Sequence, residues 1–449
     1  MGNSVGHSGN ARLDPASRRA LIAAKARSNP KERFNNLLHH LTYELVEECL
    51  ARIPSSSAPG EDGMTAKQAR ENLAWILPPI LKQIREGRYE APPVRRVYIP
   101  KADGKQRPIG VPAIVDRAIQ AAMAKVLNEI YEQDFLKCSF GFRPKTGCHH
   151  ALATINEVLH KWKLNHALEV DIRDFFGSLS HEWLRKFLGL RIGDMRVLKL
   201  IDAWLSAGVM EQGKWQATEN GVPQGGSISP LLANIYLHYV LDLWWERKIK
   251  GRLRGKAQLV RYADDLVILL GSRQEAEDVK ALLKVRLAQF GLTLSDEKTH
   301  MTDLTPRGSL GGQDRRRMTF LGFNIFRAVN RNGTGWKTVF QTEGKRFTRA
   351  KAAMKERLFR RMHREVNEQA AAINAVLRGH FNYYGLAGNL RKLSRFRHYT
   401  IRYWMRCLSR RSQTGAITWA RMTELLDENP LAQPRIRLSY PELAACARL

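Results

Sequence analysis

The sequence predicts an α+β fold. Short runs rich in β-branched and aromatic residues, which are typical of strands, lie at 94–99, 167–172, 259–270 and 320–326. Apolar residues recur at helical spacing around these runs, and the chain beyond about residue 340 shows helical periodicity only. Because the run at 259–270 reads as two strands that meet at a short acidic break, we expect hairpin pairing and an antiparallel sheet flanked by helices.

Residues 1–90 are predicted to form an N-terminal helical extension. They begin with a polar, basic arm at 1–30 that leads into a helix. Apolar residues at 34–53 follow the i, i+3, i+4 spacing of an amphipathic helix, and a second helix should cover 65–86. The Ser, Pro, Gly and Asp residues of 54–63 indicate a loop between these two helices.

The middle of the chain is predicted to alternate between strands and helices. The turn Lys101-Ala-Asp-Gly-Lys105 follows the strand at 94–99 and should close a hairpin. Helices are expected at 116–135, at 231–245, where the residues are mostly apolar and therefore buried, and at 276–290, where they are amphipathic.

The chain carries a large positive charge. Its 449 residues include 73 Lys and Arg against 43 Asp and Glu, a formal charge of +30. Residues 344–411 hold 18 of the Lys and Arg and only 3 Glu, interleaved with aromatic residues in a helical pattern. Because phosphate neutralisation dominates nucleic-acid binding, this surplus points to a nucleic-acid partner. With 44% hydrophobic residues, the composition excludes a disordered chain.

Several classes of protein are disfavoured. The five cysteines never form a Cys-x-x-Cys pair, so the sequence supports neither a zinc ribbon nor a disulfide framework and suits a reducing compartment. The N-terminus lacks the apolar core of a signal peptide, and the apolar run at 231–245 is interrupted by Asn234, His238 and Asp242. We therefore expect a soluble protein without a membrane partner, in the cytoplasm (associated with a bacterial nucleoid) or in an organelle matrix.

Three acids form the central chemical feature. Asp264 and Asp265 are adjacent between two apolar runs; a regular strand would place them on opposite faces, whereas a tight hairpin turn would expose both. Asp171 ends the strand at 167–172. Crowded carboxylates are costly unless a cation neutralises them, and Mg²⁺ takes such ligands together with substrate phosphates. Three carboxylates from neighbouring strands can hold two metal ions about 4 Å apart, although an isolated Asp-Asp pair is more often an ordinary turn.

Three further motifs accompany the acids. Gly221-Val-Pro-Gln224-Gly-Gly precedes the buried helix, and its glycines permit a close backbone approach. Lys101 and Arg107 place two cations on the first hairpin, where they can grip a triphosphate. Phe320-Leu-Gly-Phe323 follows shortly after Glu297-Lys298-Thr299. Each motif alone would fit an ordinary loop or basic turn, so their order and spacing are the specific signal.

In this order the motifs resemble those of the reverse transcriptases encoded by group II introns, over nearly the whole chain. Residues 57–65 are similar to the family's N-terminal block, 94–112 and 138–144 to its two finger blocks, and Tyr262-Ala263-Asp264-Asp265 to its catalytic box. The resemblance implies a right-hand polymerase with fingers, an antiparallel-sheet palm and a helical thumb. Its parts would be the N-terminal extension at 1–90, fingers and palm at 91–330, a thumb or maturase domain at 331–395 and a basic helical nucleic-acid-binding region at 396–449.

The resemblance also implies roles for individual positions. Asp171, Asp264 and Asp265 match the catalytic acids that bind two Mg²⁺ ions, which Mn²⁺ can replace. Phe176 matches the bulky residue that excludes the 2′-hydroxyl of a ribonucleotide; such a wall is needed because a merely apolar pocket rejects an added hydroxyl poorly. The implied nucleotide pocket comprises Lys101, Arg107, Ile172, Phe176 and Gln224, and the implied primer–template contacts are Tyr262 and Lys298.

Residues 374–385 are similar to the family's maturase segment, which follows the polymerase as a helical thumb. Arginine grips phosphates and aromatic rings stack on unpaired bases, so the segment predicts RNA binding. The alternative is a thumb helix in which Phe381 and one of the two tyrosines belong to the core. The RNA-binding candidates are Arg378, Asn382, Tyr383, Tyr384, Arg391 and Lys392.

The chain departs from the family pattern at three points. Gly177 stands where Asp is common after the Phe-Phe pair, and Ser295 stands where Asn is frequent before Glu-Lys-Thr. Neither change removes a metal ligand, so we expect activity to survive. No His and paired-Cys pattern of an endonuclease domain precedes Leu449, so a mobile element of this kind would prime on existing 3′ ends or nicks.

These observations leave three functions open. The first is an RNA-directed DNA polymerase of group II intron type, which extends a DNA primer on an RNA template with dNTPs and binds structured intron RNA to aid splicing and mobility. The second is a free-standing intron-like reverse transcriptase that serves DNA repair or phage defence. The third is a splicing factor without polymerase activity, which the intact acids argue against. The DNA that flanks the gene would separate the first two, and the oligomeric state cannot be read from the sequence.

Overall fold

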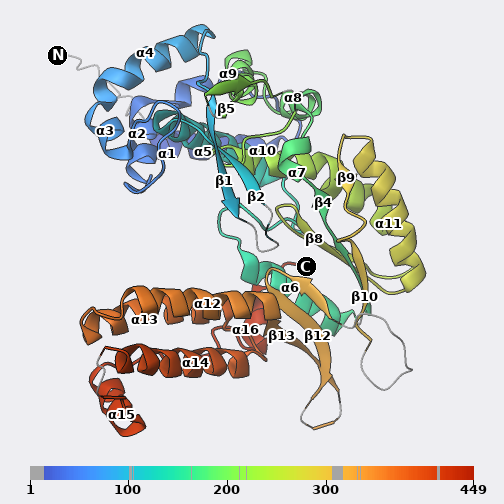
Figure 1. Cartoon of the computed structure of the whole chain (residues 1–449). Coiled ribbons are helices and arrows are strands. Elements are labelled where there is room, and N and C mark those ends of the chain that lie inside the picture. Colours follow the sequence, from blue (N-terminus) through green and yellow to red (C-terminus); the bar gives the residue numbers. More distant parts are fainter. Residues whose placement is uncertain are drawn as a thin grey trace, which may run out of the picture. The chain divides into compact units, whose positions relative to one another are not determined.

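The computed structural model describes residues 15–100, 104, 106–162, 164–211, 213–218, 220–305, 317–330, 332–333, 335–411 and 415–449. The chain forms two compact units, each assembled from three segments. Unit 1 comprises Met1–Pro144, Ile172–Ile249 and Leu282–Leu294, and unit 2 comprises Lys145–Asp171, Lys250–Ala281 and Ser295–Leu449. Figure 1 shows these elements and labels many of them with numbers in sequence order.

Helices make up the N-terminal part of unit 1. They are α1 (Pro15–Ser28), α2 (Tyr43–Ala51), α3 (Ala66–Glu71), α4 (Leu73–Glu86) and α5 (Ile114–Asp134). α1 and α2 pack against α5, on which Ile119 and Leu127 are fully buried. The helices expected at 65–86 and 116–135 are present, and the first of them is broken at Asn72.

The single helix predicted at 34–53 is wrong. A 3-10 turn at Leu38–His40 comes first, and α2 then begins behind its own N-cap, Thr42. The backbone N–H of Leu37 donates to Oδ2 of Asp194 at 2.9 Å. These side-chain acceptors satisfy the backbone donors that a continuous helix would pair internally, and apolar spacing alone does not reveal them.

A four-stranded sheet completes the first half of unit 1. Its strands are β1 (Val94–Pro100), β2 (Gln106–Val111), β5 (Val209–Glu211) and β6 (Lys214–Gln216), in the order β2-β1-β5-β6. β1 and β2 are antiparallel, with Val97 opposite Ile109, so the hairpin predicted after 94–99 is confirmed. β1 and β5 run parallel.

Shorter elements form the rest of unit 1. They are β4 (Ile172–Arg173), α7 (Phe175–Ser178), α8 (His181–Gly189), α9 (Met195–Ser206), α10 (Ser229–Leu237) and β9 (Thr293–Leu294). β4 pairs with β9, and α10 continues into π-helical turns at His238–Asp242 and Trp245–Ile249. α10 is almost entirely buried, as predicted for 231–245, and the side chain of Asn234 donates to the carbonyl oxygen of Gly141.

An antiparallel sheet forms the centre of unit 2. Its strands are β3 (His166–Val170), β7 (Gln258–Tyr262), β8 (Asp265–Leu270) and β10 (His300–Asp303), in the order β10-β3-β8-β7. All three neighbouring pairs are antiparallel, so the predicted sheet is confirmed. α6 (Cys148–Lys161) packs against β7, and α11 (Arg273–Ala288) follows β8 close to the helix predicted at 276–290.

The single strand predicted at 320–326 is wrong, because the chain reverses within it. β11 (Met318–Phe320) and β12 (Phe323–Val329) form a hairpin, and β13 (Trp336–Thr342) pairs with β12. Leu321 and Gly322 form the turn with φ angles of 49° and 76°. Two-residue hairpin turns favour such left-handed angles. A leucine rarely adopts them, and Leu321 therefore hid the turn from the sequence pattern.

Helices form the C-terminal part of unit 2. They are α12 (Gly344–Arg360), α13 (Val366–Tyr384), α14 (Leu390–Ser409), α15 (Trp419–Glu428) and α16 (Tyr440–Cys446). α12, α13 and α14 lie side by side (Figure 1), and one hydrophobic core that contains Leu377, Phe396 and Trp404 joins them to α15. The domain boundary predicted at 395 falls inside α14.

The last helix, α16, packs against α6. The segment before it is tied to the end of α13, where Leu438 and Leu386 form a parallel bridge. Among the residues that the structure describes, no helix combines the length and apolar character needed to cross a lipid bilayer.

Candidate active site

The β7–β8 hairpin carries two of the three predicted acids at its tip. Tyr262 pairs with Asp265, so the turn consists only of Ala263 and Asp264. Ala263 has a φ of 58°, a left-handed conformation that hairpin turns use but alanine rarely adopts. Asp265 is exposed and Asp264 is half-buried. The expectation of a tight turn at the two acids is therefore confirmed.

A buried arginine braces this turn. The side chain of Arg261 is fully buried, and its Nη1 donates to the carbonyl oxygen of Ala263 at 3.0 Å. A hydrogen bond from a charged donor is roughly twice as strong as a neutral one, and burial removes competing water. The sequence interpretation missed Arg261. Its only sequence signal is a charged residue inside the apolar run that precedes the acids.

The third acid joins the hairpin through the register of the sheet. β3 and β8 are antiparallel with Val170 opposite Leu266, so the residue after β3 lies beside the residue that begins β8. Asp171 and Asp265 accordingly line one cavity of about 210 Å³. Asp264 occupies the turn that adjoins this cavity.

Lys298 lines the same cavity and faces one of the acids. Its Nζ lies 3.4 Å from Oδ2 of Asp171, while its side chain remains 68% exposed. An exposed ion pair of this kind contributes at most about 1 kcal/mol, so the ammonium can turn to another anion at small cost. Ser295 holds Asp171 through the backbone, since its N–H donates to the Asp171 carbonyl at 2.8 Å. This contact does not need the Asn that is frequent at position 295 in the family.

Glu169 is a second residue that the sequence interpretation missed. It is buried at the wall of the same cavity, two residues before Asp171 on the same strand. Its carboxylate accepts from the Thr302 hydroxyl at 2.6 Å and from the Thr319 N–H at 2.7 Å. Glu169 therefore ties β3 to β10 and β11 and holds the cavity wall in place. The alternation of side chains along a strand is the signal that could have drawn attention to it.

The donor set suits a hard divalent cation. Among the residues that the structure describes, no three His, Cys, Asp or Glu side chains are grouped closely enough to hold a metal ion by themselves. Mg²⁺ usually binds through one or two carboxylates and completes its shell with water and substrate phosphates. The paired carboxylates of Asp171 and Asp265 in one cavity meet that requirement.

In unit 1, Phe176 is held against the loop that precedes α10. The Val222 N–H donates to the carbonyl oxygen of Phe176 at 2.8 Å. Gly221 has a φ of 90°, and a Cβ at this position would lie 2.9 Å from the carbonyl oxygen of Gly177. The loop therefore touches the backbone of α7 in a way that glycine alone allows. The presence of glycine at position 177 also has a local explanation, because a Cβ there would lie 2.3 Å from Oδ2 of Asp174.

Gln224 and Arg107 lie on adjoining parts of unit 1. Gly225, which follows Gln224, approaches β2 so closely that a Cβ would lie 2.4 Å from a backbone oxygen of that strand. Arg107 is exposed on β2, and Gln224 is half-buried on the loop. Of the other predicted pocket residues, Ile172 is buried in β4 and Lys101 lies outside the described residues.

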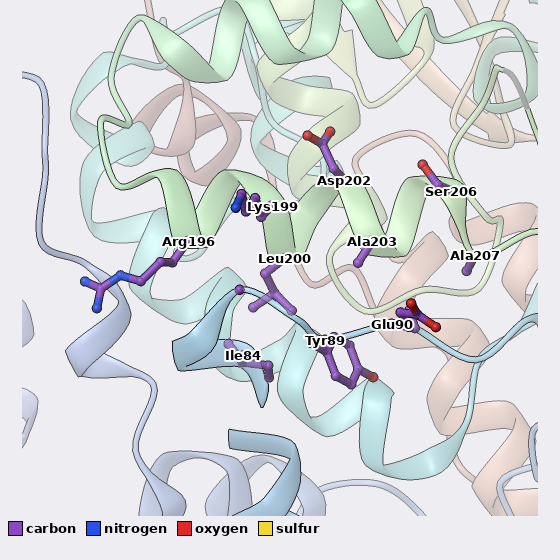
Figure 2. Close-up of a pocket in the computed structure, with 12 residues that line it drawn as sticks. Ile84, Tyr89, Glu90, Arg196, Lys199, Leu200, Asp202, Ala203, Ser206 and Ala207 are labelled. Carbon is purple, nitrogen blue, oxygen red and sulfur yellow. The ribbon is translucent and has the colours of Figure 1, made fainter. Parts of the chain in front are cut away.

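A larger cavity of unit 1, of about 470 Å³, lies between the end of α4 and α9 (Figure 2). None of the predicted site residues lines it. Two of its polar lining groups have partners within the protein. The Tyr89 hydroxyl donates to Oδ1 of the buried Asp116 at 2.6 Å, and Asp202 accepts from an arginine of α8 at 2.6 Å. Leu200 points toward Tyr89 across the opening (Figure 2).

Two of the RNA-binding candidates pack inside unit 2. Tyr383 and Tyr384 contact the ring of Phe323, with centroids 5.9 and 5.1 Å away. The Tyr383 hydroxyl donates to the carbonyl oxygen of Leu321 at 2.9 Å, and burial raises the pKa of Tyr383. The alternative of a core role matches these contacts.

The other RNA-binding candidates lie on the outside of α13 and α14. Arg378 and Asn382 are exposed on α13, and Arg391 is exposed on α14. Lys392 is half-buried, with its Nζ 4.9 Å from the ring centroid of Phe347 on α12. Three of the six candidates are thus exposed and accessible to a nucleic acid, and the other three are half-buried.

We call the exposed cations of α13 and α14, together with two lysine–tyrosine pairs of α12 and α14, the basic surface. The sequence interpretation missed the two pairs. Lys351 on α12 lies 5.4 Å from the ring centroid of Tyr399 on α14, and Lys355 lies 5.9 Å from that of Tyr403. The two tyrosine rings stack on each other at 6.3 Å. The sequence signal is the spacing of like residues: the two lysines are four positions apart on α12, and the two tyrosines are four positions apart on α14. This spacing places like residues on one helix face.

Comparison with known proteins identifies the family. A family model described as reverse transcriptase (RNA-dependent DNA polymerase) matches residues 99–325. Protein YkfC of Escherichia coli is 32% identical over 351 residues, which cover 70% of this chain and 88% of YkfC. Group II intron-encoded protein LtrA of Lactococcus lactis subsp. cremoris is 30% identical over 390 residues, which cover 71% of this chain and 64% of LtrA. The chain belongs to the reverse transcriptase family.

Membership of this family establishes the enzyme class. The reverse transcriptase is an RNA-directed DNA polymerase, which uses an RNA template, a primer and dNTPs, and its family generally uses divalent ions such as Mg²⁺. An uncharacterised 91 kDa protein in the cob intron of Schizosaccharomyces pombe is 26% identical, with 73% of this reverse transcriptase and 48% of that protein covered. The matched range 99–325 contains all three acids and ends before α12.

Proposed function

We propose that Asp171, Asp264 and Asp265 hold two Mg²⁺ ions and that the enzyme copies RNA into DNA by two-metal nucleotidyl transfer. The supporting observation is the shared cavity of Asp171 and Asp265, with Asp264 in the adjoining two-residue turn. When bound, such ions stabilise the attacking and the leaving oxygens of the transfer. Mn²⁺ should replace Mg²⁺, because both ions favour carboxylate oxygens.

Lys298 and Tyr262 serve the primer in this proposal. The ammonium of Lys298, 3.4 Å from Oδ2 of Asp171, neutralises one acid in the ligand-free enzyme and can turn to the phosphate of a primer terminus. Tyr262 is the last residue of β7, is half-buried, and is separated from Asp264 by Ala263 alone. Its ring can support the sugar of the same primer nucleotide.

Phe176 forms the wall against the sugar of the incoming dNTP. Its α7 backbone is bonded to the loop that carries Gln224, so the ring and the amide belong to one rigid part of the pocket. Arg107 and Lys101, from the first hairpin, pair with the triphosphate, and Ile172 supports the pocket from β4. Exclusion of a 2′-hydroxyl requires such a steric wall, since apolar surroundings alone discriminate weakly.

The basic helices bind structured intron RNA to aid splicing and mobility. The support is the exposed Arg378, Asn382 and Arg391, together with the Lys351–Tyr399 and Lys355–Tyr403 pairs on the same group of helices. Cations meet phosphates, and aromatic rings stack on unpaired bases. A free-standing enzyme that serves DNA repair or phage defence is the alternative, because the same surface and the same chemistry would serve it equally. The DNA around the gene decides between them by the presence or absence of a folded intron.

Primer extension tests the polymerase assignment directly. The purified protein should extend a DNA primer on an RNA template with dNTPs and Mg²⁺, and Asp264→Ala should abolish extension while RNA binding persists. Asp278→Ala is the matched control, because Asp278 is an exposed acid on α11 that accepts a hydrogen bond from Gln274. Normal extension by the Asp264→Ala protein would show that the acid assignment is wrong. A wild-type protein that binds RNA but never extends a primer would favour a splicing factor instead.

A further inference from the structure

A cavity of about 350 Å³ within unit 2, which we call the arginine cavity, is lined by the segment between α15 and α16, the end of α13 and the start of α6. Its lining carries two arginines, an imidazole and a carboxamide and includes no carboxylate: Arg435, Arg437, His149, Asn382, Ile436 and Leu438. The two cavities described above differ in this respect, because carboxylates line both of them.

Backbone hydrogen bonds hold the two arginines in place. The N–H groups of Arg437 and Leu438 both donate to the carbonyl oxygen of Gly385, at 2.6 and 3.1 Å. The Ala387 N–H donates in turn to the Leu438 carbonyl at 3.0 Å. Gly385 permits this approach, since a Cβ there would lie 3.0 Å from the carbonyl oxygen of Arg435. The arginines therefore extend from a backbone of defined position, which lowers the entropy lost when they bind a ligand.

Both arginines are accessible to a ligand. Arg435 and Arg437 are exposed, whereas Ile436 between them is half-buried, and this period of two places both arginines on one face of the segment. Among the described residues, no carboxylate forms an ion pair with either guanidinium, whereas Arg360 on α12 and Arg421 on α15 each pair with a glutamate. Two positive charges thus line a cavity without a negative group, and an anion would neutralise them.

The other polar side chains of the cavity add hydrogen-bonding groups. Nε2 of His149 lies 2.8 Å from the carbonyl oxygen of Tyr383. Because a carbonyl oxygen only accepts, Nε2 carries a proton and donates it, and this bond orients the ring. Asn382 is exposed on α13, so its amide is free to meet a ligand. Arginine forks and side-chain amides are typical contacts of phosphate oxygens in nucleic-acid complexes.

Tyr383 connects the arginine cavity to the acids of the same unit. Its carbonyl oxygen accepts from His149, and its hydroxyl donates to the carbonyl oxygen of Leu321 at 2.9 Å. Leu321 directly follows Phe320, which lines the cavity of the acids. One residue of α13 therefore bonds to the helix that lines one cavity and to the turn beside the other, so a single strand of nucleic acid can contact both.

We propose that the arginine cavity binds backbone phosphates of the template–primer while the 3′ end of the primer lies at the acids. Arg435 and Arg437 pair with neighbouring phosphates, and Asn382 donates to a phosphate or its sugar. None of these groups reads a base, so the contact adds affinity without sequence preference. The sequence predicted nucleic-acid binding for 396–449 without naming these arginines. The proposal rests on the proposed function in one respect, because it takes the acids as the place of the 3′ end.

Binding of a template–primer in EDTA tests the cavity without metal ions at the acids. Arg435→Gln/Arg437→Gln should bind an RNA template with an annealed DNA primer about tenfold more weakly than the wild type. The slope of log K against log salt should flatten by about 1.4 to 1.8 units, because each phosphate contact contributes roughly 0.7 to 0.9. Arg435→Lys/Arg437→Lys, which keeps both charges, should recover most of that slope.

A matched control removes two exposed arginines with the same spacing. Arg252 and Arg254 precede β7, at the end of that strand away from the acids. Arg252→Gln/Arg254→Gln should leave both the affinity and the salt slope close to the wild type. If it flattens the slope as much as the Arg435→Gln/Arg437→Gln protein does, the net charge of the chain governs binding and the proposal is wrong.

Backbone substitution identifies the strand that is bound. A methylphosphonate removes the charge of one phosphate, and one is placed in turn at each position of the primer or of the template. At a contacted phosphate it should weaken binding to the wild type but not to Arg435→Gln/Arg437→Gln, which already lacks the partner. Such a loss confined to the primer assigns the primer strand, and one confined to the template assigns the template. If no position shows a loss that depends on the arginines, the proposal fails.

Single-turnover extension separates this proposal from the assignment of the acids. Arg435→Gln/Arg437→Gln should extend at a rate within about twofold of the wild type at saturating template–primer, while its KM rises by about tenfold, because the contact is made equally before and during the reaction. Normal extension by Asp264→Ala would overturn the acids and leave arginine-dependent binding standing. Loss of extension in Asp264→Ala, with unchanged binding by the arginine variant, would overturn the arginine cavity alone.

Discussion

In the proposed function, the acids of the β-sheet and the basic surface of α12–α14 contact the same nucleic acid through opposite kinds of interaction. At the sheet, Asp171 and Asp265 line one small cavity, and their positions depend on strand register and a two-residue turn. On the helices, exposed cations and the Lys–Tyr pairs are spread over faces that carry no comparable constraint. One region therefore depends on a few atoms at defined places and the other on a sum of many charges.

This difference predicts different responses to mutation. A single substitution at the acids should remove the chemistry and leave nucleic-acid binding intact. A single substitution on the basic surface should be almost silent, because neighbouring cations replace the lost contact and salt screens each of them. The following experiments test whether the two regions separate in this way.

The largest effect is expected for Asp265→Asn. Asparagine keeps the size of the side chain at the start of β8 but removes the charge that a cation requires. Primer extension should fall by about a thousandfold or more, in line with the loss of a central electrostatic group from an active site. The measurement is single-turnover extension of a DNA primer on RNA, with RNA affinity measured in parallel. Extension within tenfold of the wild type would contradict the role of Asp265, because a loss of about tenfold or less is what a peripheral group would cause.

Phe176→Ala should change selectivity rather than overall rate. Removal of the ring opens space beside the sugar, so incorporation of ribonucleotides relative to deoxyribonucleotides should rise by about a hundredfold. The measurement is the ratio of kcat/KM for rGTP and dGTP on the same template. Phe175→Leu serves as a control, because Phe175 is buried on the same short helix and should affect stability more than selectivity. An unchanged ratio in Phe176→Ala would assign the sugar wall to another residue.

The sequence predicted most of the elements on which the acids depend. The β7–β8 hairpin, β3 and the antiparallel pairing follow from short apolar runs that end at acids, and the structure has all of them. The errors arose where one side chain overrides a pattern. Asp194 caps the turn that interrupts 34–53, and Leu321 adopts a conformation usual for glycine. Neither effect leaves a trace in apolar periodicity.

The candidate site was predicted less evenly. The three acids carry a motif, whereas Arg261 and Glu169 act through buried hydrogen bonds to a backbone and to threonines, which no spacing rule reveals. The tyrosines of the maturase segment show the opposite case. Their sequence context left both base stacking and a core role open, and their rings contact Phe323, because a helix face that is basic overall can still bury its aromatic residues.

A smaller effect is expected on the basic surface. The triple substitution of Arg391, Arg395 and Arg402 by Gln removes three exposed charges from α14. The slope of log K against log salt for single-stranded RNA should flatten by about 2 units, because each phosphate contact contributes roughly 0.7. Arg391→Gln alone should weaken binding less than about threefold, consistent with a distributed surface. Primer extension at saturating RNA should stay close to the wild type.

A matched control removes the same charge elsewhere. In this control, Gln replaces Lys186, Arg273 and Lys284, which are exposed on α8 and α11. If this control flattens the salt slope as much as the α14 variant, the charge of the whole chain, rather than the basic surface, governs binding. A large effect of Arg391→Gln alone would instead show that the surface contains a defined contact.

The smallest effect is expected for Ala263→Gly in the turn itself. Ala263 has a φ of 58°, and an L-residue with a side chain costs roughly 1–2 kcal/mol in the left-handed region. Glycine removes that cost but loses more backbone entropy on folding, about 0.5–1 kcal/mol, so the free energy of unfolding should rise by no more than about 1.5 kcal/mol. Urea denaturation measures the change, and Ala263→Val, which adds a β-branched side chain at the same φ, should destabilise the protein. Arg261 still holds the carbonyl of residue 263 in the glycine variant, since its hydrogen bond is to the backbone. Primer extension should therefore be retained; a large loss of extension in a stable Ala263→Gly protein would show that the acids depend on a rigid turn and not on the arginine brace.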